Sequence, residues 1–143
     1  MATLLKKEIL LDGVGMCDYQ SEILVDKQHS FFFEHECAHV PGLMLIEGGR
    51  QNAMAIAHKY FDTSLSEAFV INNIAVEFSS LASANDNVQC YARITERQEK
   101  AGRLKKAVVE TFCYQYSRKI ASSVATFTIF SKSILARMES KHY

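Results

Sequence analysis

The sequence predicts an α+β domain in which one long buried helix is wrapped by a five- to six-stranded antiparallel sheet. Two observations lead to this fold class. Apolar side chains surround almost the whole circumference of one helical segment near residue 50, so that helix needs cover on most sides. Four later segments alternate apolar and polar residues, the pattern of half-buried strands. One sheet curved round one helix is the simplest packing that buries both.

The chain is expected to form a single domain spanning residues 1–143, because 48% hydrophobic content is ordinary for a globule with a core. Its 16 basic and 16 acidic residues cancel, which argues against electrostatic binding to nucleic acid or to an anionic membrane. No apolar run approaches the ~18 residues of a membrane span, and we expect a cytoplasmic protein. Four scattered cysteines without a CxxC pair indicate reduced thiols.

The expected elements follow in chain order. A strand is predicted in YQSEILVDKQ, followed by a motif loop at about 29–42. The central helix is predicted at about 43–61, because Pro41 and Gly42 mark its entry and the polar DTS its exit. Hairpin-connected strands are expected at about 68–132, with a short C-terminal tail after them. Their segments are INNIAVEFS, VQCYARITER, KKAVVETFCYQYS and IASSVATFTIFSK.

Gly48 and Gly49 lie inside the predicted helix. A glycine there costs about 0.5–1 kcal/mol relative to alanine, so two together need a compensating reason. We expect a sheet or a partner helix to approach the helix backbone closely at this point. The alternative is a helix that breaks at the pair.

The segment FEHECAHVPGLMLIEGGRQ, residues 33–51, resembles the signature of the A-factor biosynthesis hotdog family, approximately F-D-H-P-x-D-H-V-P-G-M-x-L-x-E-A-A-R-Q. The anchors in register are His35, His39, Val40, Pro41, Gly42, Glu47, Arg50 and Gln51. Ala38 stands where the family usually has a second aspartate, and Glu36 where it has proline. The resemblance implies a hotdog fold. Because family members commonly carry two hotdog repeats, it also implies a homodimer or a heterodimer with a second hotdog protein.

The same resemblance implies an activity, the transfer of a β-ketoacyl group from an acyl thioester to a hydroxyl of a glycerol-type phosphate, in signal or secondary-metabolite synthesis. The acyl group would be carried by coenzyme A or by the phosphopantetheine of an acyl carrier protein, and no other cofactor is expected. Two alternatives keep the same site: an acyl-CoA or acyl-carrier-protein thioesterase, and a 3-hydroxyacyl thioester dehydratase. A third is a non-catalytic acyl-binding protein, which the missing aspartate at Ala38 favours.

The chemistry of the residues supports a site at the start of the helix. Burial would raise the pKa of the Glu47 carboxyl and Arg50 would lower it, and the sequence leaves that balance open. The Gly42 N–H, in the first helical turn, can donate to a developing oxyanion. Proton transfer is therefore assigned to Glu47 with His35 or His39, the backbone donor to Gly42, and orientation of Glu47 or substrate binding to Arg50 and Gln51.

Purely structural interpretations stand beside this one. Glu47 and Arg50, three residues apart, could form only an ion pair. His58 near the helix end is interpreted as a capping or surface residue. The basic run from Arg103 to Lys106 is either a solvated hairpin or a contact for a carrier protein or coenzyme A phosphates. The loop histidines fit no standard ligand spacing, so no metal is expected.

Overall fold

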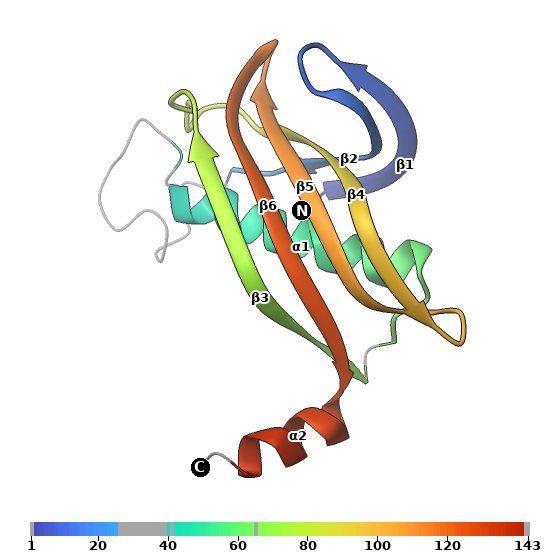
Figure 1. The fold of residues 1–143 in the computed structure, drawn as a ribbon. Helices are drawn as coiled ribbons and strands as arrows, with labels where there is room; N and C mark the ends of the chain where they lie inside the picture. Colours follow the sequence, from blue (N-terminus) through green and yellow to red (C-terminus); the bar gives the residue numbers. More distant parts are fainter. Residues whose placement is uncertain (1, 26–39, 41, 65, 142–143) are drawn as a thin grey trace.

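The computed structural model describes residues 2–25, 40, 42–64 and 66–141, and shows six strands curved round one long helix (Figure 1). All neighbouring strands are antiparallel, in the order β1-β2-β4-β5-β6-β3. This is the α+β hotdog arrangement that the sequence predicts. The elements are β1 Ala2–Leu11, β2 Gly15–Ile23, α1 Gly42–Tyr60, β3 Glu67–Phe78, β4 Val88–Lys100, β5 Arg103–Gln115, β6 Arg118–Ser131 and α2 Lys132–Ser140.

The N-terminal hairpin of β1 and β2 was only partly expected. The sequence analysis placed one strand at residues 19–28, whereas the structure ends β2 at Ile23 and adds the whole of β1. The connecting turn uses Gly13 and Gly15 at φ values of 74° and 106°, a left-handed region that glycine enters without a side-chain clash. β1 escaped prediction because, as an edge strand, it carries charges among its apolar residues.

The tail after β6 forms a second helix, α2, where the sequence analysis expected no element. Ser131 caps it, because its Oγ accepts a hydrogen bond of 3.2 Å from the Ile134 N–H. No residue of α2, all of which the structure describes, is buried. Figure 1 shows the helix projecting from the end of β6, away from the body of the sheet.

Helix α1 is continuous and closely covered. Its buried residues are Met44, Leu45, Gly48, Asn52, Ala53, Ile56 and Ala57. At Gly48 an added Cβ would lie 2.3 Å from Cδ1 of Ile23, so β2 approaches the helix backbone as the sequence predicts. At Gly49 the nearest atom would be the Ser123 Oγ at 3.7 Å, an ordinary contact. A break at the glycine pair is therefore wrong.

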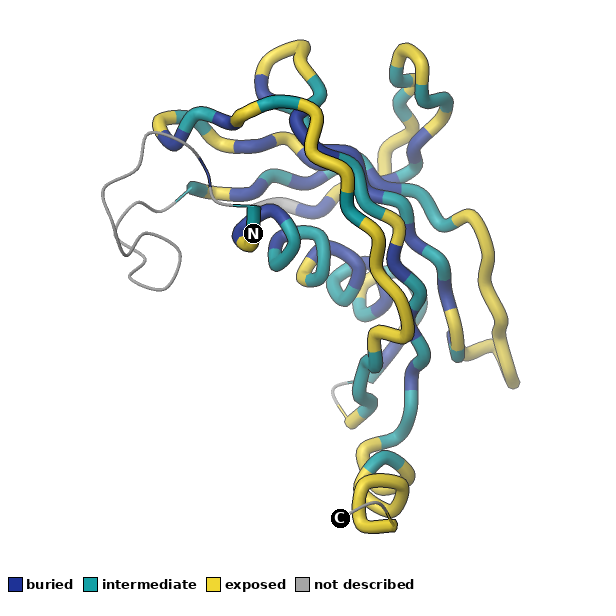
Figure 2. The backbone as a smooth tube through the Cα atoms, turned by 60° about the vertical axis from the view of Figure 1, so that its left-hand side comes forward, coloured by how far each residue is buried: buried dark blue, intermediate teal, exposed yellow. Residues whose placement is uncertain are grey.

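The inner faces of the central strands complete the core. Val88, Cys90 and Ala92 of β4 are fully covered, which confirms the predicted alternation there. The three cysteines in the described ranges, Cys17, Cys90 and Cys113, are free and buried, as expected for reduced thiols. By contrast β3 lies at the sheet edge and is largely exposed along its second half (Figure 2). In the described ranges, no helix is long and apolar enough to cross a membrane.

Candidate active site

The predicted site residues fall into two groups. Gly42, Glu47, Arg50 and Gln51 lie on the first half of α1. His35 and His39 lie outside the described residues, as does most of the motif loop. The described part of the site is therefore the helix entrance and the acid that follows it. No three potential metal ligands gather among the described side chains.

The Glu47 carboxylate is held by two neighbours on its own helix. The Arg50 guanidinium donates from Nε to Oε2 at 2.7 Å and from Nη2 to Oε1 at 2.5 Å. The Gln51 amide donates to Oε1 at 3.1 Å. A two-point contact between a guanidinium and a carboxylate fixes direction as well as distance. Arg50 and Gln51 therefore hold the Glu47 carboxylate in one direction.

These contacts decide the charge of Glu47 in the chain. The hydrogen bond from Arg50 is the largest influence and lowers the pKa of the carboxyl below its ordinary value, against the opposing effect of burial. The side chains of Arg50 and Glu47 keep 39% and 33% of their surface exposed, so desolvation is incomplete. Glu47 is thus an ionised carboxylate at neutral pH, able to accept hydrogen bonds, and a weaker base than an unpaired carboxylate.

Glu47 points away from the sheet. It lies nine residues before Ile56, which is 1% exposed in the core. Nine residues correspond to about two and a half turns, so Glu47 lies on the opposite face of the helix from Ile56. Arg50 also lines a small cavity with Ile46, Ile74 and Ser123, between α1 and the sheet. That cavity, of about 10 Å³, has room for about one water molecule, so it does not itself hold an acyl chain.

Gly42 begins α1 at a crowded entrance. An added Cβ there would lie 3.0 Å from Cζ of Phe78, so glycine keeps the first turn accessible next to that ring. Just before it, the Val40 N–H donates to the Ala82 carbonyl at 2.8 Å and holds the chain against the segment that follows β3. Five residues separate Gly42 from Glu47, about 7.5 Å of rise and 140° of rotation. The Gly42 N–H points along the axis, out of the N-terminal end of the helix, whereas the Glu47 side chain projects sideways from it, so within one chain the two face different directions.

A buried polar pair behind the site was missed by sequence reasoning. The Ser21 Oγ donates to Asn52 Oδ1 at 2.9 Å, and both residues are almost fully buried. The Asn52 Nδ2 is also buried and has no partner among the described residues. Asn52 on the apolar side of α1 was the available signal, but its partner is 31 residues away and could not be identified without the fold.

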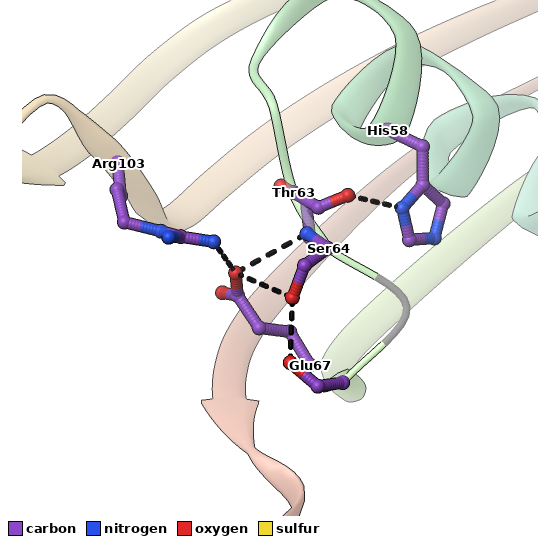
Figure 3. Close-up of polar contacts among 6 residues, drawn as sticks. His58, Thr63, Ser64, Glu67 and Arg103 are labelled. Atoms are coloured by element: carbon purple, nitrogen blue, oxygen red, sulfur yellow. Dashed lines mark hydrogen bonds and ion pairs between the residues drawn. The ribbon is translucent and has the colours of Figure 1, made fainter.

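A second polar cluster closes the far end of α1 (Figure 3). Glu67 pairs with Arg103 and accepts hydrogen bonds from the Ser64 N–H and Oγ, while His58 Nδ1 lies 2.5 Å from the Thr63 carbonyl. Burial acts to raise the pKa of Glu67, but Ser64 and Arg103 outweigh it and lower that pKa. The cluster joins the helix end to β3 and to the β4–β5 hairpin. His58 is half-buried and contacts the segment that follows the helix, not one of the helix's last carbonyls, and Arg103 is already paired.

Comparison with known sequences gives two matches. The profile of the A-factor biosynthesis hotdog domain matches residues 6–131 of the chain. The chain is also 32% identical over 91 residues to 2-oxo-3-(phosphooxy)propyl 3-oxoalkanoate synthase from Streptomyces virginiae. The similar stretch is 54% of this chain and 29% of that protein, so it spans less than a third of the relative's length.

Solved structures with the same fold have low sequence identity. A hot-dog-like protein from Thermanaerovibrio acidaminovorans superposes with a TM-score of 0.67 at 13% identity, covering 87% of this chain and 88% of its own. A protein described as a probable thioesterase from Escherichia coli gives a TM-score of 0.57 at 17% identity, covering 79% and 83%. At these identities the likeness shows the fold alone.

Proposed function

The chain belongs to the A-factor biosynthesis hotdog domain family, and from this premise we propose that it transfers a β-ketoacyl group from an acyl thioester to a hydroxyl of a small glycerol-type phosphate. The thioester would be carried by coenzyme A or by an acyl carrier protein. The name of the Streptomyces virginiae relative supports this reaction, because it describes an ester between a 3-oxoalkanoate and a phosphorylated three-carbon alcohol. The product would serve as a signal or as a precursor of a secondary metabolite.

The observation that carries the proposal is the ionised Glu47 carboxylate, fixed by Arg50 and Gln51 one to two turns inside the helix. The acceptor's hydroxyl oxygen would bond to the thioester carbonyl carbon, the C–S bond would break, and the hydroxyl proton would end on the departing thiolate. Glu47 accepts the hydrogen bond of the attacking hydroxyl. His35 or His39 carries the proton to sulfur. The Gly42 N–H donates to the carbonyl oxygen while it holds negative charge.

A dimer would bring these groups together. Gly42 and Glu47 of one chain face different directions, and we propose that Gly42 of one copy faces Glu47 of the other. The sheet edge formed by β3 supports such pairing, because β3 is 12 residues long and among the described strands pairs only with β6. Ile71 and Ile74 on this strand are 38% and 39% exposed. We propose that two copies, or this chain and a second hotdog protein, join along β3.

The test is turnover by a Glu47→Ala variant. Purified protein is incubated with a 3-oxoacyl thioester, with and without dihydroxyacetone phosphate, and free thiol and phosphorylated ester are measured. We expect ester from the wild type, and in the variant a loss of turnover on the order of 100-fold or more with an almost unchanged melting temperature. Glu8→Ala, which removes an exposed carboxylate on β1, is the matched control. Full activity of Glu47→Ala would refute the assignment.

The same incubations separate the alternative reactions. Free thiol without ester, whether or not the phosphate is present, identifies a thioesterase. An enoyl product from a 3-hydroxyacyl thioester identifies a dehydratase. Binding of the thioester without any turnover identifies a non-catalytic acyl-binding protein, in which Glu47 and Arg50 are only an ion pair.

A further inference from the structure

Helix α2 presents apolar side chains that the described residues cover only in part. Ile134 and Met138, one turn apart on the same face, are 44% and 43% exposed. Nine residues are too few for a helix to be stable by itself in water, so an apolar face on α2 calls for a surface to pack against. The helix follows β6 directly, where Ser131 pairs with Glu67 at the start of β3.

A second exposed apolar patch lies at the opposite end of β3. It consists of Leu43, Phe78 and Leu81, which are 62%, 52% and 67% exposed, and is called here the β3 corner. The corner borders the helix entrance, since the Phe78 ring lies against Gly42. The Arg118 guanidinium holds it in place by donating to the Leu81 carbonyl at 3.0 Å. Figure 1 shows the end of β3 beside the start of α1, and α2 at the other end of the strand.

One chain cannot join these two patches. The 12 residues of β3 separate them by about 40 Å at ordinary strand rise, whereas α2 is only about 13 Å long. Antiparallel pairing of β3 with β3 of a second copy would instead bring α2 of one copy close to the β3 corner of the other. If the two strands pair about their midpoint, between Asn72 and Asn73, Glu67 of each copy lies opposite Phe78 of the other. Helix α2 of one copy then emerges beside the β3 corner of its partner.

We propose that α2 of one copy packs on the β3 corner of a second copy and forms part of the wall of the partner's acyl-thioester site at the Gly42 entrance. Ile134 and Met138 cover Phe78 and Leu81 across the interface. This inference rests on the homodimer of the proposed function. It adds that each site is incomplete without the partner's C-terminal helix.

The contact is tested by cysteine cross-linking of the purified dimer. Met138→Cys and Leu81→Cys are introduced into one chain, which is oxidised with diamide and analysed on a non-reducing gel. We expect a covalent dimer from the double variant and none from either single variant or the wild type. An intramolecular disulfide is ruled out by the length of β3, because bridged Cα atoms lie within about 7 Å. Light scattering of the unmodified protein establishes its assembly beforehand.

Each result has a distinct meaning. A wild-type dimer that gives no covalent species in the double variant overturns the α2 contact and leaves the proposed dimer standing. A monomer at the assay concentration overturns the α2 contact and the homodimer, and leaves pairing with a second hotdog protein as the form of the proposed dimer. Cross-linking by Met138→Cys alone would show that position 138 meets the same position or a native cysteine of the other copy, without Leu81→Cys, which also contradicts the inference.

A second variant tests the contribution of α2 to the site. Ile134→Asp with Met138→Asp changes only residues that are already exposed in the single chain, so its fold should persist. We expect its KM for the thioester to rise by on the order of 10-fold or more, since a wall of the site is lost. Leu10→Asp, which alters a side chain 72% exposed on β1, is the control and should behave as the wild type. An unchanged KM in the double variant would show that α2 forms no part of the site.

Discussion

Replacing Gly48 with alanine should destabilise the protein, whereas the same replacement at Gly49 should stabilise it. Both positions lie inside α1, where alanine is favoured over glycine by about 0.8–1 kcal/mol. The new methyl at position 48 would lie 2.3 Å from Cδ1 and 2.8 Å from Cγ1 of Ile23. At position 49 it would lie 3.7 Å from the Ser123 Oγ. The two variants share the helix contribution and differ in the steric one.

The size of the difference follows from the surroundings of Ile23. This side chain is 6% exposed and packs in a buried cluster, so it cannot swing aside into open space. Overpacking of a filled core costs about 1–3 kcal/mol. After the helix gain is subtracted, Gly48→Ala should lose about 0–2 kcal/mol of unfolding free energy. Gly49→Ala should gain about 0.5–1 kcal/mol, which leaves the two variants about 1–3 kcal/mol apart.

Urea denaturation followed by circular dichroism, at one fixed protein concentration, measures both free energies. In a thermal scan the difference corresponds to about 3–5 °C per kcal/mol for a chain of this size. Adding Ile23→Val to Gly48→Ala removes Cδ1 and should recover part of the loss. The family pattern has alanine at both positions, so pattern alone would predict stabilisation at each. Equal stability of the two alanine variants, or no coupling to Ile23→Val, would refute the steric reasoning.

Three further predictions concern ionisable groups. Arg50→Gln removes the largest influence that lowers the Glu47 pKa, so the acid limb of the pH–rate profile should move to higher pH. The free energy of unfolding should fall by only about 0.3–1 kcal/mol, because the ion pair is partly exposed. An acid limb that does not move would contradict control of turnover by Glu47. Glu67 has a lowered folded pKa, so its stabilisation is present above the ordinary value of 4.5 and is lost as pH falls through the folded value. Glu67→Gln should therefore be about 1 kcal/mol less stable than the wild type at pH 7 in urea titrations and equally stable in strong acid, and a gap independent of pH would speak against this. The hydrogen bond with Cys113 and burial raise the pKa of the Cys90 thiol. After alkylation at pH 8 without denaturant, mass spectrometry should therefore find Cys90 unmodified. Rapid alkylation of Cys90 in the native protein would disprove its burial.

Much of the fold could be predicted because its signals are local. The helix prediction of 43–61 differs from α1 by one residue at each end, since Gly42 and the polar DTS mark its limits and its apolar circumference identifies it as buried. The alternation of Val88, Cys90 and Ala92 identified a core strand for the same reason. β1 and α2 were missed, because both lie at the margin of the fold and neither carries a continuous buried pattern.

The candidate site, too, has features that could be predicted from the sequence and features that could not. The spacing of Gly42, Glu47, Arg50 and Gln51 was readable from the motif, and a regular helix then brings Arg50 and Gln51 into contact with Glu47. The balance of burial and charge at Glu47 was not readable, because it depends on how much solvent reaches the side chain.

By itself, the sequence determined the family, the long buried helix and the identity of the acid inside it, since these depend on residue types at fixed spacings along the chain. Only the tertiary structure decided that Gly48 lies against Ile23, that Asn52 bonds Ser21 in the core, and that β3 forms the sheet edge. The physical reason is that these features join residues distant in sequence. Their proximity arises only when the sheet has curved round the helix.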